Sequence, residues 1–170
     1  MLRSMPREFR VDCVKLRIPP PIVMLVAAAS MWALHRWLPL AHWIATPWNR
    51  LGGLAGGAGV AIDVAAFRRF GQVRTTVNPM DPSKATRLVT DGVFRISRNP
   101  MYLGLLLLLI GWALWLGSAS AWLIPPLFVL MITWLQIIPE EQVLSRLFGA
   151  QYLEYRQSVA RWIGRRGPGR

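Results

Sequence analysis

Residues 98–141 read RNPMYLGLLLLLIGWALWLGSASAWLIPPLFVLMITWLQIIPEE. They contain two apolar runs, from about 101 to 117 and from about 121 to 138, and only Ser118-Ala119-Ser120 separates them. Each run is long enough to cross the roughly 30 Å hydrocarbon core of a bilayer at about 1.5 Å per residue. The short separation therefore predicts a tight antiparallel hairpin of two transmembrane helices.

The polar residues at the open end of this hairpin are predicted to meet. Because two crossings return the chain to its starting side, residues 98–102 and the pair Glu140-Glu141 are expected at one membrane face, on adjacent helices. Pro139 is expected to end the fourth span just before this pair. Asn99 is a good N-cap and Pro100 suits a first helical turn. The free amides of that turn, with the charge of Arg98, favour an anion. A ligand with a carboxylate and an ammonium group suits this arrangement; the alternatives are interfacial glutamates or glutamates paired with Arg98.

Two earlier apolar segments, about 18–38 and about 51–67, complete the expected bundle. Each has a suitable length for a spanning helix. With 54% apolar residues, the chain is expected to be an all-α integral membrane bundle of four transmembrane helices. Residues 40–44 are a candidate fifth, re-entrant or interfacial, element. The 170 residues allow one membrane domain, 1–170, which begins with a basic tail, 1–17.

The basic residues predict the orientation of the bundle. Of the 20 Lys and Arg residues, only Arg36 and Arg50 lie between the first and second spans. The others precede the first span, separate the second from the third, or follow the fourth. The positive-inside rule therefore places both termini and the polar site in the cytoplasm, which means the inner membrane in a bacterium.

Two further classes of function are not expected from the sequence. The net charge of +12 flanks membrane spans and forms no basic stripe, so no nucleic-acid partner is expected. His35 and His42 have no carboxylate or cysteine beside them, so no metal site is expected. The glycines of 52–59 resemble a phosphate loop, but within an apolar helix such small residues indicate close helix packing.

Asp63 is an acid inside a predicted span, where a charge is costly and should face protein or water. Two interpretations are open for it: it helps to position a ligand, or it pairs with Arg68 or Arg69. Farther along, apolar residues recur every three or four positions from Val143 to Trp162, which predicts a C-terminal amphipathic helix, interrupted near Gly149, at the cytoplasmic surface. It either closes the mouth of the bundle or rests on lipid.

The C-terminal half resembles the isoprenylcysteine carboxyl methyltransferase family and is similar to the related phospholipid methyltransferases. The resemblance rests on residues 88–94, on 98–104, on Glu140-Glu141 after the hairpin, and on 148–155. It implies an integral membrane enzyme that transfers a methyl group from S-adenosyl-L-methionine, with about 86–163 as the cofactor-binding part. The cofactor-binding residues that it implies, with Arg98 added for its charge, are Thr86, Arg87, Leu88, Val89, Phe94, Arg98, Asn99, Pro100, Met101, Tyr102 and Glu140.

Three positions depart from the family pattern. Asn99 stands where the family usually has histidine, and it retains hydrogen bonding but cannot titrate. Phe94 stands where a tyrosine is usual. Gln136 stands where the eukaryotic enzymes hold the substrate carboxylate with an arginine, so Gln136 is the predicted substrate-binding residue and prenylcysteine carboxylates are expected to be poor substrates.

The sequence therefore predicts a methyltransferase that acts on a small or lipophilic membrane-associated acceptor of the carboxylate or thiol type. Such nucleophiles need no general base, whereas an amine must be deprotonated, and Glu141 is the candidate base. The alternatives are a phospholipid N-methyltransferase and a non-catalytic membrane scaffold or transport component with the same fold. The expected partners are the methyl acceptor and membrane lipid, with no obligate protein partner.

Overall fold

A computed structural model describes residues 18–73 and 87–165. Within these ranges the chain is helical and has no strands apart from isolated bridges. The predicted basic tail lies outside the described residues. The helical elements are α2 (Pro20–Trp37), η2 (Trp48–Arg50), α3 (Leu51–Val73), η4 (Gly92–Arg95), α4 (Pro100–Leu116), η5 (Ala119–Leu123), α5 (Ile124–Ile132), η6 (Thr133–Ile137), α6 (Ile138–Phe148) and α7 (Ala150–Ser158).

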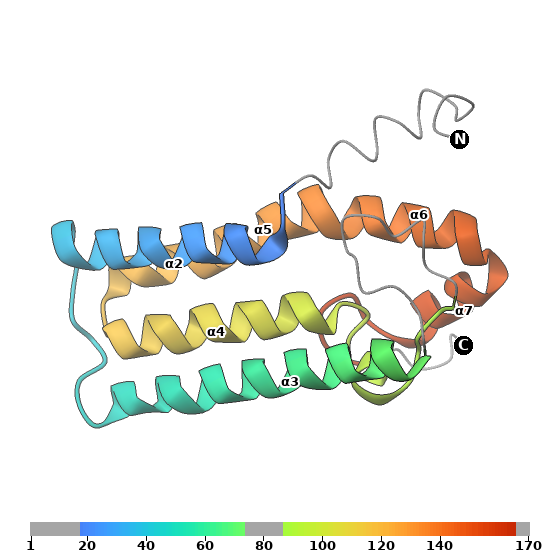
Figure 1. Ribbon diagram of the computed structural model, residues 1–170. Helices are drawn as coiled ribbons and strands as arrows, with labels where there is room; N and C mark the ends of the chain where they lie inside the picture. The colour runs from blue at the N-terminus through green and yellow to red at the C-terminus, as the bar shows by residue number, and fades with distance from the viewer. Residues whose placement is uncertain (1–17, 74–86, 166–170) are drawn as a thin grey trace.

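The long helices run roughly along one axis (Figure 1), with α2 beside α5 and α3 beside α4. The segments Trp48–Gln72 and Ala119–Phe148 are long and apolar enough to cross a membrane, while the apolar helix Pro100–Leu116 is shorter. Large apolar side chains such as Leu54, Leu127 and Trp134 are exposed on the outer surfaces. A lateral surface of this kind suits lipid. Two of the four predicted spans thus meet the length and composition of a membrane helix.

The predicted hairpin is present. The helix α4 ends at Gly117, which adopts a left-handed conformation with φ +65°. A side chain is strained in this conformation, and a Cβ on Gly117 would also overlap the carbonyl oxygen of Ile44. The buried hydroxyls of Ser118 and Ser120 are hydrogen-bonded at 2.8 Å. The turn is therefore as short as the sequence indicates.

Residues 38–47 connect α2 to η2 and form no helix. This segment pairs with the hairpin turn instead, because Trp43 N donates to Gly117 O at 3.1 Å and Ala119 N donates to Ala41 O at 2.8 Å. Residues 40–44 are thus a connection held at the end of the bundle, and they add no fifth helix. The hairpin turn has backbone N–H and C=O groups without helical partners, and residues 41–44 supply hydrogen bonds to them.

The glycines of α3 bring its backbone against α4, as predicted. A Cβ on Gly59 would lie 2.6 Å from Gly104 O, and a Cβ on Gly111 would lie 2.6 Å from Gly52 O. Gly53 and Gly57 meet nothing within 4 Å. Close packing of two apolar helices through small residues replaces the hydrophobic effect that lipid cannot supply.

Pro139 does not end the last long helix, although the sequence suggests a stop there. The chain continues without a break from α5 through a π turn, η6, into α6. Proline removes one helical hydrogen bond, and its ring presses on the carbonyl four residues earlier. The wider π turn immediately before α6 relieves both problems, so the helix can run to Phe148.

The C-terminal helix differs in extent from the prediction. Gly149, with φ +50°, separates α6 from α7, in agreement with the expected interruption. However, α7 ends at Ser158, four residues before Trp162. After α7, the backbone of residues 160–164 is hydrogen-bonded to the loop that precedes α4. Arg98 N donates to Ala160 O at 3.1 Å, and Gly164 N donates to Ile96 O at 2.8 Å. These long-range bonds replace the last helical turn.

Candidate active site

The two polar ends of the hairpin meet where α4 begins and α6 leaves the bundle. Tyr102, in the first turn of α4, is buried, and its hydroxyl donates to Glu140 Oε2 at 3.0 Å. Glu140 lies in the first turn of α6. This contact confirms the predicted meeting of residues 98–102 with the glutamate pair.

A second contact across this junction is ionic. Arg98 Nη2 lies 3.1 Å from Glu141 Oε1, and the two side chains are only 3% and 8% exposed. Arg161 binds the same carboxylate in a bidentate manner, with Nε–Oε1 3.0 Å and Nη2–Oε2 2.7 Å. Two arginines therefore share one glutamate at this junction.

The geometry of Glu141 does not suit the predicted role of general base. Both of its oxygens already accept charge-assisted hydrogen bonds from Arg98 and Arg161, so each oxygen is occupied within the protein. Glu141 is better placed to hold the two arginines. A role in acid–base chemistry would require these ion pairs to break.

Arg98 has unused hydrogen-bonding capacity. Among the described residues, its Nε and Nη1 atoms are buried and have no hydrogen-bond partner. Buried polar groups are nearly always paired, and an unpaired charged donor is costly. These two unpaired donors point to an anionic group that binds beside Glu141.

Asn99 occupies the N-cap position of α4 and Pro100 the first turn, as predicted, but Asn99 makes no side-chain cap. Its Nδ2 donates instead to Arg161 O at 3.1 Å. Ser97 Oγ donates to the same carbonyl at 3.3 Å and accepts from Asn99 N at 3.0 Å. The predicted capping by Asn99 is therefore wrong, because the returning chain offers its amide a carbonyl.

An aromatic cluster lies beside these charges. Phe94 packs edge-to-face on Phe70 with ring centroids 5.2 Å apart, and its carbonyl accepts from Tyr155 Oη at 2.7 Å. Val89 and Tyr152 are buried in the same cluster, against which Leu88 and Met101 pack. Of the remaining predicted residues, Arg87 is exposed and Thr86 lies outside the described residues.

Tyr152 on α7 is surrounded by the charged groups of this site. Burial raises the pKa of Tyr152, and the negative charges of Glu141 and Glu140 add to this effect, whereas Arg98 opposes it. The phenol is therefore neutral at physiological pH and can serve only as a hydrogen-bonding group. Tyr152 on α7 thus lies near Arg98, just before α4, and near the glutamates in the first turn of α6.

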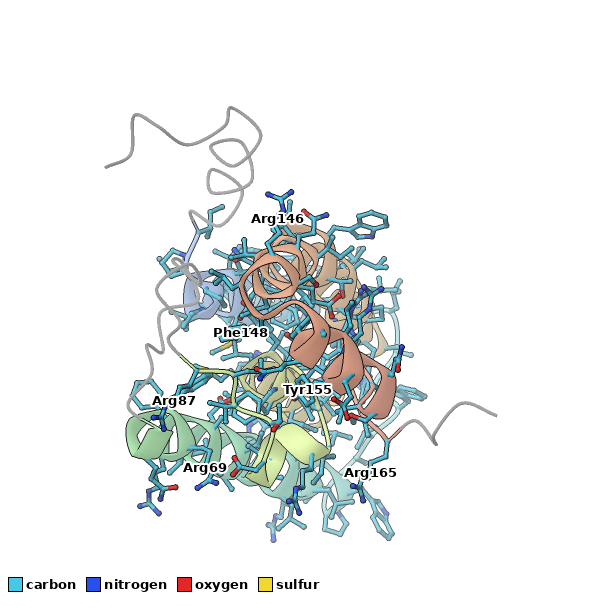
Figure 2. All side chains as sticks on the ribbon, turned by 90° about the vertical axis from the view of Figure 1, so that its right-hand side faces the viewer. Arg69, Arg87, Arg146, Phe148, Tyr155 and Arg165 are labelled. Carbon is cyan, nitrogen blue, oxygen red and sulfur yellow. The ribbon has the colours of Figure 1, made fainter. Side chains whose placement is uncertain are left out.

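Figure 2 views this end of the molecule along the bundle. The labelled arginines Arg69, Arg87, Arg146 and Arg165 lie around its rim, while Phe148 and Tyr155 lie nearer the middle of the view. Arg69 also joins α3 to the loop before η4, because its guanidinium pairs with Asp91.

Arg69, one of the two partners expected for Asp63, pairs with Asp91 instead. Asp63 packs on Gly104, where a Cβ would overlap its carboxylate. Within the described residues its Oδ1 is buried and unpaired. Gly104 and Tyr102 lie on nearly opposite sides of α4, so Asp63 is separated from the Tyr102–Glu140 contact. In the same part of the chain, no three His, Cys, Asp or Glu residues are grouped to hold a metal.

Gln136 lies in the π turn, one helical turn before Glu140, and is 2% exposed. Its Nε2 donates to Ile18 O at 2.8 Å, at the start of α2. One of the two N–H donors of this amide is thus already used within the protein.

Comparison with known proteins decides the family. Residues 48–151, more than half of the chain, match the model of the phospholipid methyltransferase family. The chain belongs to this family. An uncharacterized protein of Haemophilus influenzae is 49% identical over 63 residues, which are 37% of this chain and 100% of that protein. The protein-S-isoprenylcysteine O-methyltransferase A of Arabidopsis thaliana is 34% identical over 106 residues, which are 60% of this chain.

The match to the plant protein spans 52% of that protein, so the chain corresponds to about half of its length. No solved structure matches. These similarities confirm the resemblance to the isoprenylcysteine and phospholipid methyltransferases. Membership of the phospholipid methyltransferase family points to a membrane methyltransferase.

The family match contains both halves of the polar junction but ends before Arg161. Arg161 is the residue that sequence reasoning missed. No spacing in the sequence signals it, since its role depends on the return of the chain after α7. Within this member of the phospholipid methyltransferase family, Arg161 binds Glu141 through its side chain and Asn99 through its carbonyl.

Proposed function

We propose that the protein is an S-adenosyl-L-methionine-dependent methyltransferase that acts on a lipophilic or small membrane-associated acceptor. The observation that carries this proposal is Arg98, whose buried Nε and Nη1 lack a partner among the described residues. The cofactor is an amino acid derivative with a carboxylate for these donors and an ammonium group for a carboxylate such as Glu140. The orphaned donors and the nearby acid therefore fit both charges of its amino acid end.

The residues that we propose to bind the cofactor follow the family resemblance. Arg98 binds the carboxylate with help from the first amides of α4. Glu140, oriented by the Tyr102 hydroxyl, binds the ammonium group. The remaining members of the set are Thr86, Arg87, Leu88, Val89, Phe94, Asn99, Pro100 and Met101. When bound, the cofactor supplies an electrophilic methyl group on a sulfonium, and aromatic faces attract such a cation.

The contribution of the chain to the reaction is positioning. Methyl transfer is an in-line displacement, so holding the two reactants in line and excluding water supplies much of the rate enhancement. Glu141 keeps Arg98 and Arg161 in place, Asn99 ties the start of α4 to the returning chain, and α7 covers the mouth. With a carboxylate or thiolate acceptor, none of these residues needs to exchange a proton.

The acceptor class has two candidates. The notable similarity to a plant isoprenylcysteine O-methyltransferase favours an oxygen nucleophile such as a carboxylate, and the thiol remains a chemical alternative. The phospholipid methyltransferase family match favours an amine. A scaffold without catalysis has no use for orphaned charged donors at the mouth, so the enzyme is preferred. The proposal requires lipid and acceptor as partners, without an obligate protein partner.

Glu140→Ala is expected to weaken cofactor binding by about 1.5–3 kcal/mol, because a hydrogen bond to a charged group is lost. Calorimetry of S-adenosyl-L-methionine binding to the purified protein in detergent measures this change. Glu154→Ala, which removes an exposed glutamate on α7, is the matched control and should bind as the wild type does. Absence of binding by folded wild-type protein would reject the proposed function.

We also propose the orientation in which four helices span the membrane and the arginine-rich end faces the cytoplasm. The distribution of basic residues supports it. Reporter fusions test it: a fusion at the C-terminus should be active only in the cytoplasm, and one inserted at Ser118-Ala119-Ser120 only outside. The reverse pattern would separate the site from cytoplasmic cofactor.

A further inference from the structure

Glu141 makes more and shorter contacts with Arg161 than with Arg98. Arg161 faces the carboxylate with two parallel donors, Nε–Oε1 at 3.0 Å and Nη2–Oε2 at 2.7 Å. Arg98 reaches only Oε1, through Nη2 at 3.1 Å. In a bidentate pair both carboxylate oxygens point toward the same guanidinium. The carboxylate is therefore aligned on Arg161, and Arg98 contacts it with a single nitrogen.

The backbone of Arg161 is held against the start of α4. Its carbonyl accepts from Asn99 Nδ2 at 3.1 Å and from Ser97 Oγ at 3.3 Å. These bonds fix the position from which the side chain reaches Glu141. The Arg161 side chain is 31% exposed, whereas that of Arg98 is 3% exposed. Arg161 thus approaches the carboxylate from the surface, and Arg98 is the more deeply buried partner.

Glu141 and an incoming carboxylate compete for the same guanidinium. Arg98 carries its donors on three nitrogens: Nη2 contacts Glu141, and Nε and Nη1 are unpaired among the described residues. A carboxylate that has no other partner binds a guanidinium through two parallel bonds. Such a contact between Glu141 and Arg98 would occupy Nη2 together with Nε or Nη1. One of the two donors assigned to the cofactor would then be lost.

We propose that Arg161 is a positioning residue, which holds both oxygens of Glu141 and so keeps Nε and Nη1 of Arg98 available for the carboxylate of the cofactor. The proposal rests on the proposed function and adds one residue to the same site. Arg161 acts through Glu141 and is not itself assigned to the cofactor. It lies beyond residues 48–151, which match the family model.

The test combines two substitutions in the full-length protein in detergent, with calorimetry of S-adenosyl-L-methionine binding as the measurement. Arg161→Gln should weaken binding about tenfold, as for the loss of one hydrogen bond to a charged group, because Glu141 then turns to Arg98. Adding Glu141→Gln removes the competing charge, so the double variant should recover most of this loss. Arg156→Gln, which removes an exposed arginine of α7, is the matched control and should bind as the wild type does.

A double variant that binds as weakly as Arg161→Gln would overturn the proposal. An ion pair with a purely structural role is broken by either substitution, and removal of its second partner cannot restore it. Wild-type affinity in Arg161→Gln would overturn the proposal as well. If Arg161→Gln does not fold, Arg161→Lys takes its place: an ammonium cannot hold both oxygens in parallel, so a smaller loss with the same recovery is expected.

A measurement without cofactor separates this proposal from the proposed function. The side-chain N–H resonances of Arg98 in isotope-labelled protein are assigned by their loss in Arg98→Lys. Arg161→Gln should move them to lower field, because a further N–H of Arg98 then binds Glu141, and the double variant should reverse this shift. Unchanged resonances reject this proposal alone. The expected shifts in a protein that does not bind S-adenosyl-L-methionine reject the proposed function and leave the competition for Arg98 in place.

Discussion

Arg98→Ala should remove measurable binding of S-adenosyl-L-methionine while the protein stays folded. The variant loses two buried, charged donors that we assign to the cofactor carboxylate, which is expected to cost about 3 kcal/mol, or roughly 100-fold in affinity. Glu141 is not left alone, because Arg161 still binds both of its oxygens. The usual penalty for an uncompensated buried charge is thereby avoided.

The matched control is Arg95→Ala, which removes an exposed arginine three residues earlier in the same loop. Calorimetry should give the wild-type affinity for this control, and thermal unfolding should show both variants folded. Arg98→Lys should recover only part of the affinity, since an ammonium cannot present two parallel donors. Equal affinities for the Arg98→Ala and Arg95→Ala proteins would remove Arg98 from the proposed site.

Gly59→Ala should destabilise the bundle by about 3 kcal/mol, at the upper end of the usual cost of overpacking. Its Cβ would lie 2.6 Å from Gly104 O and 3.2 Å from Leu107 Cβ, and a backbone carbonyl inside a helix cannot move away. The two helices would have to separate along the contact that also places Tyr102. Titration with SDS in mixed micelles measures the free energy of unfolding.

Gly57→Ala provides the control on the same helix, because nothing lies within 4 Å of its Cβ. It should unfold at the same denaturant fraction as the wild type or slightly higher, given the better helix propensity of alanine. If the two substitutions have equal effects, α3 and α4 do not pack through their glycines.

The helices and the closeness of Tyr102 to Glu140 follow from local properties of the chain. Apolar run length predicts a spanning helix, and Ser118-Ala119-Ser120 leaves room only for a tight turn. An even number of crossings then brings residues 98–102 to the glutamate pair without any knowledge of packing. The tight turn and the contact are present in the structure because each depends on neighbouring residues or on simple length.

The roles of single polar groups depend on where distant segments return. Asn99 was expected to cap its helix, but Arg161 O lies within reach of its side chain. Pro139 was expected to stop a helix that a π turn allows to continue. Glu141 was expected to take protons, yet two arginines from separate parts of the chain bind it.

What the sequence by itself determined is the all-helical class, the hairpin, the glycine contact and the residue types at the site, because hydrophobic length and small-residue spacing act locally. What only the tertiary structure decided is which hydrogen-bonding atoms remain unused: Nε and Nη1 of Arg98 and Oε1 of Gln136. A polar atom is satisfied or free according to every segment that reaches it, and Ile18 and Arg161 reach this site from opposite ends of the chain. The ligand chemistry that we propose therefore comes from the fold.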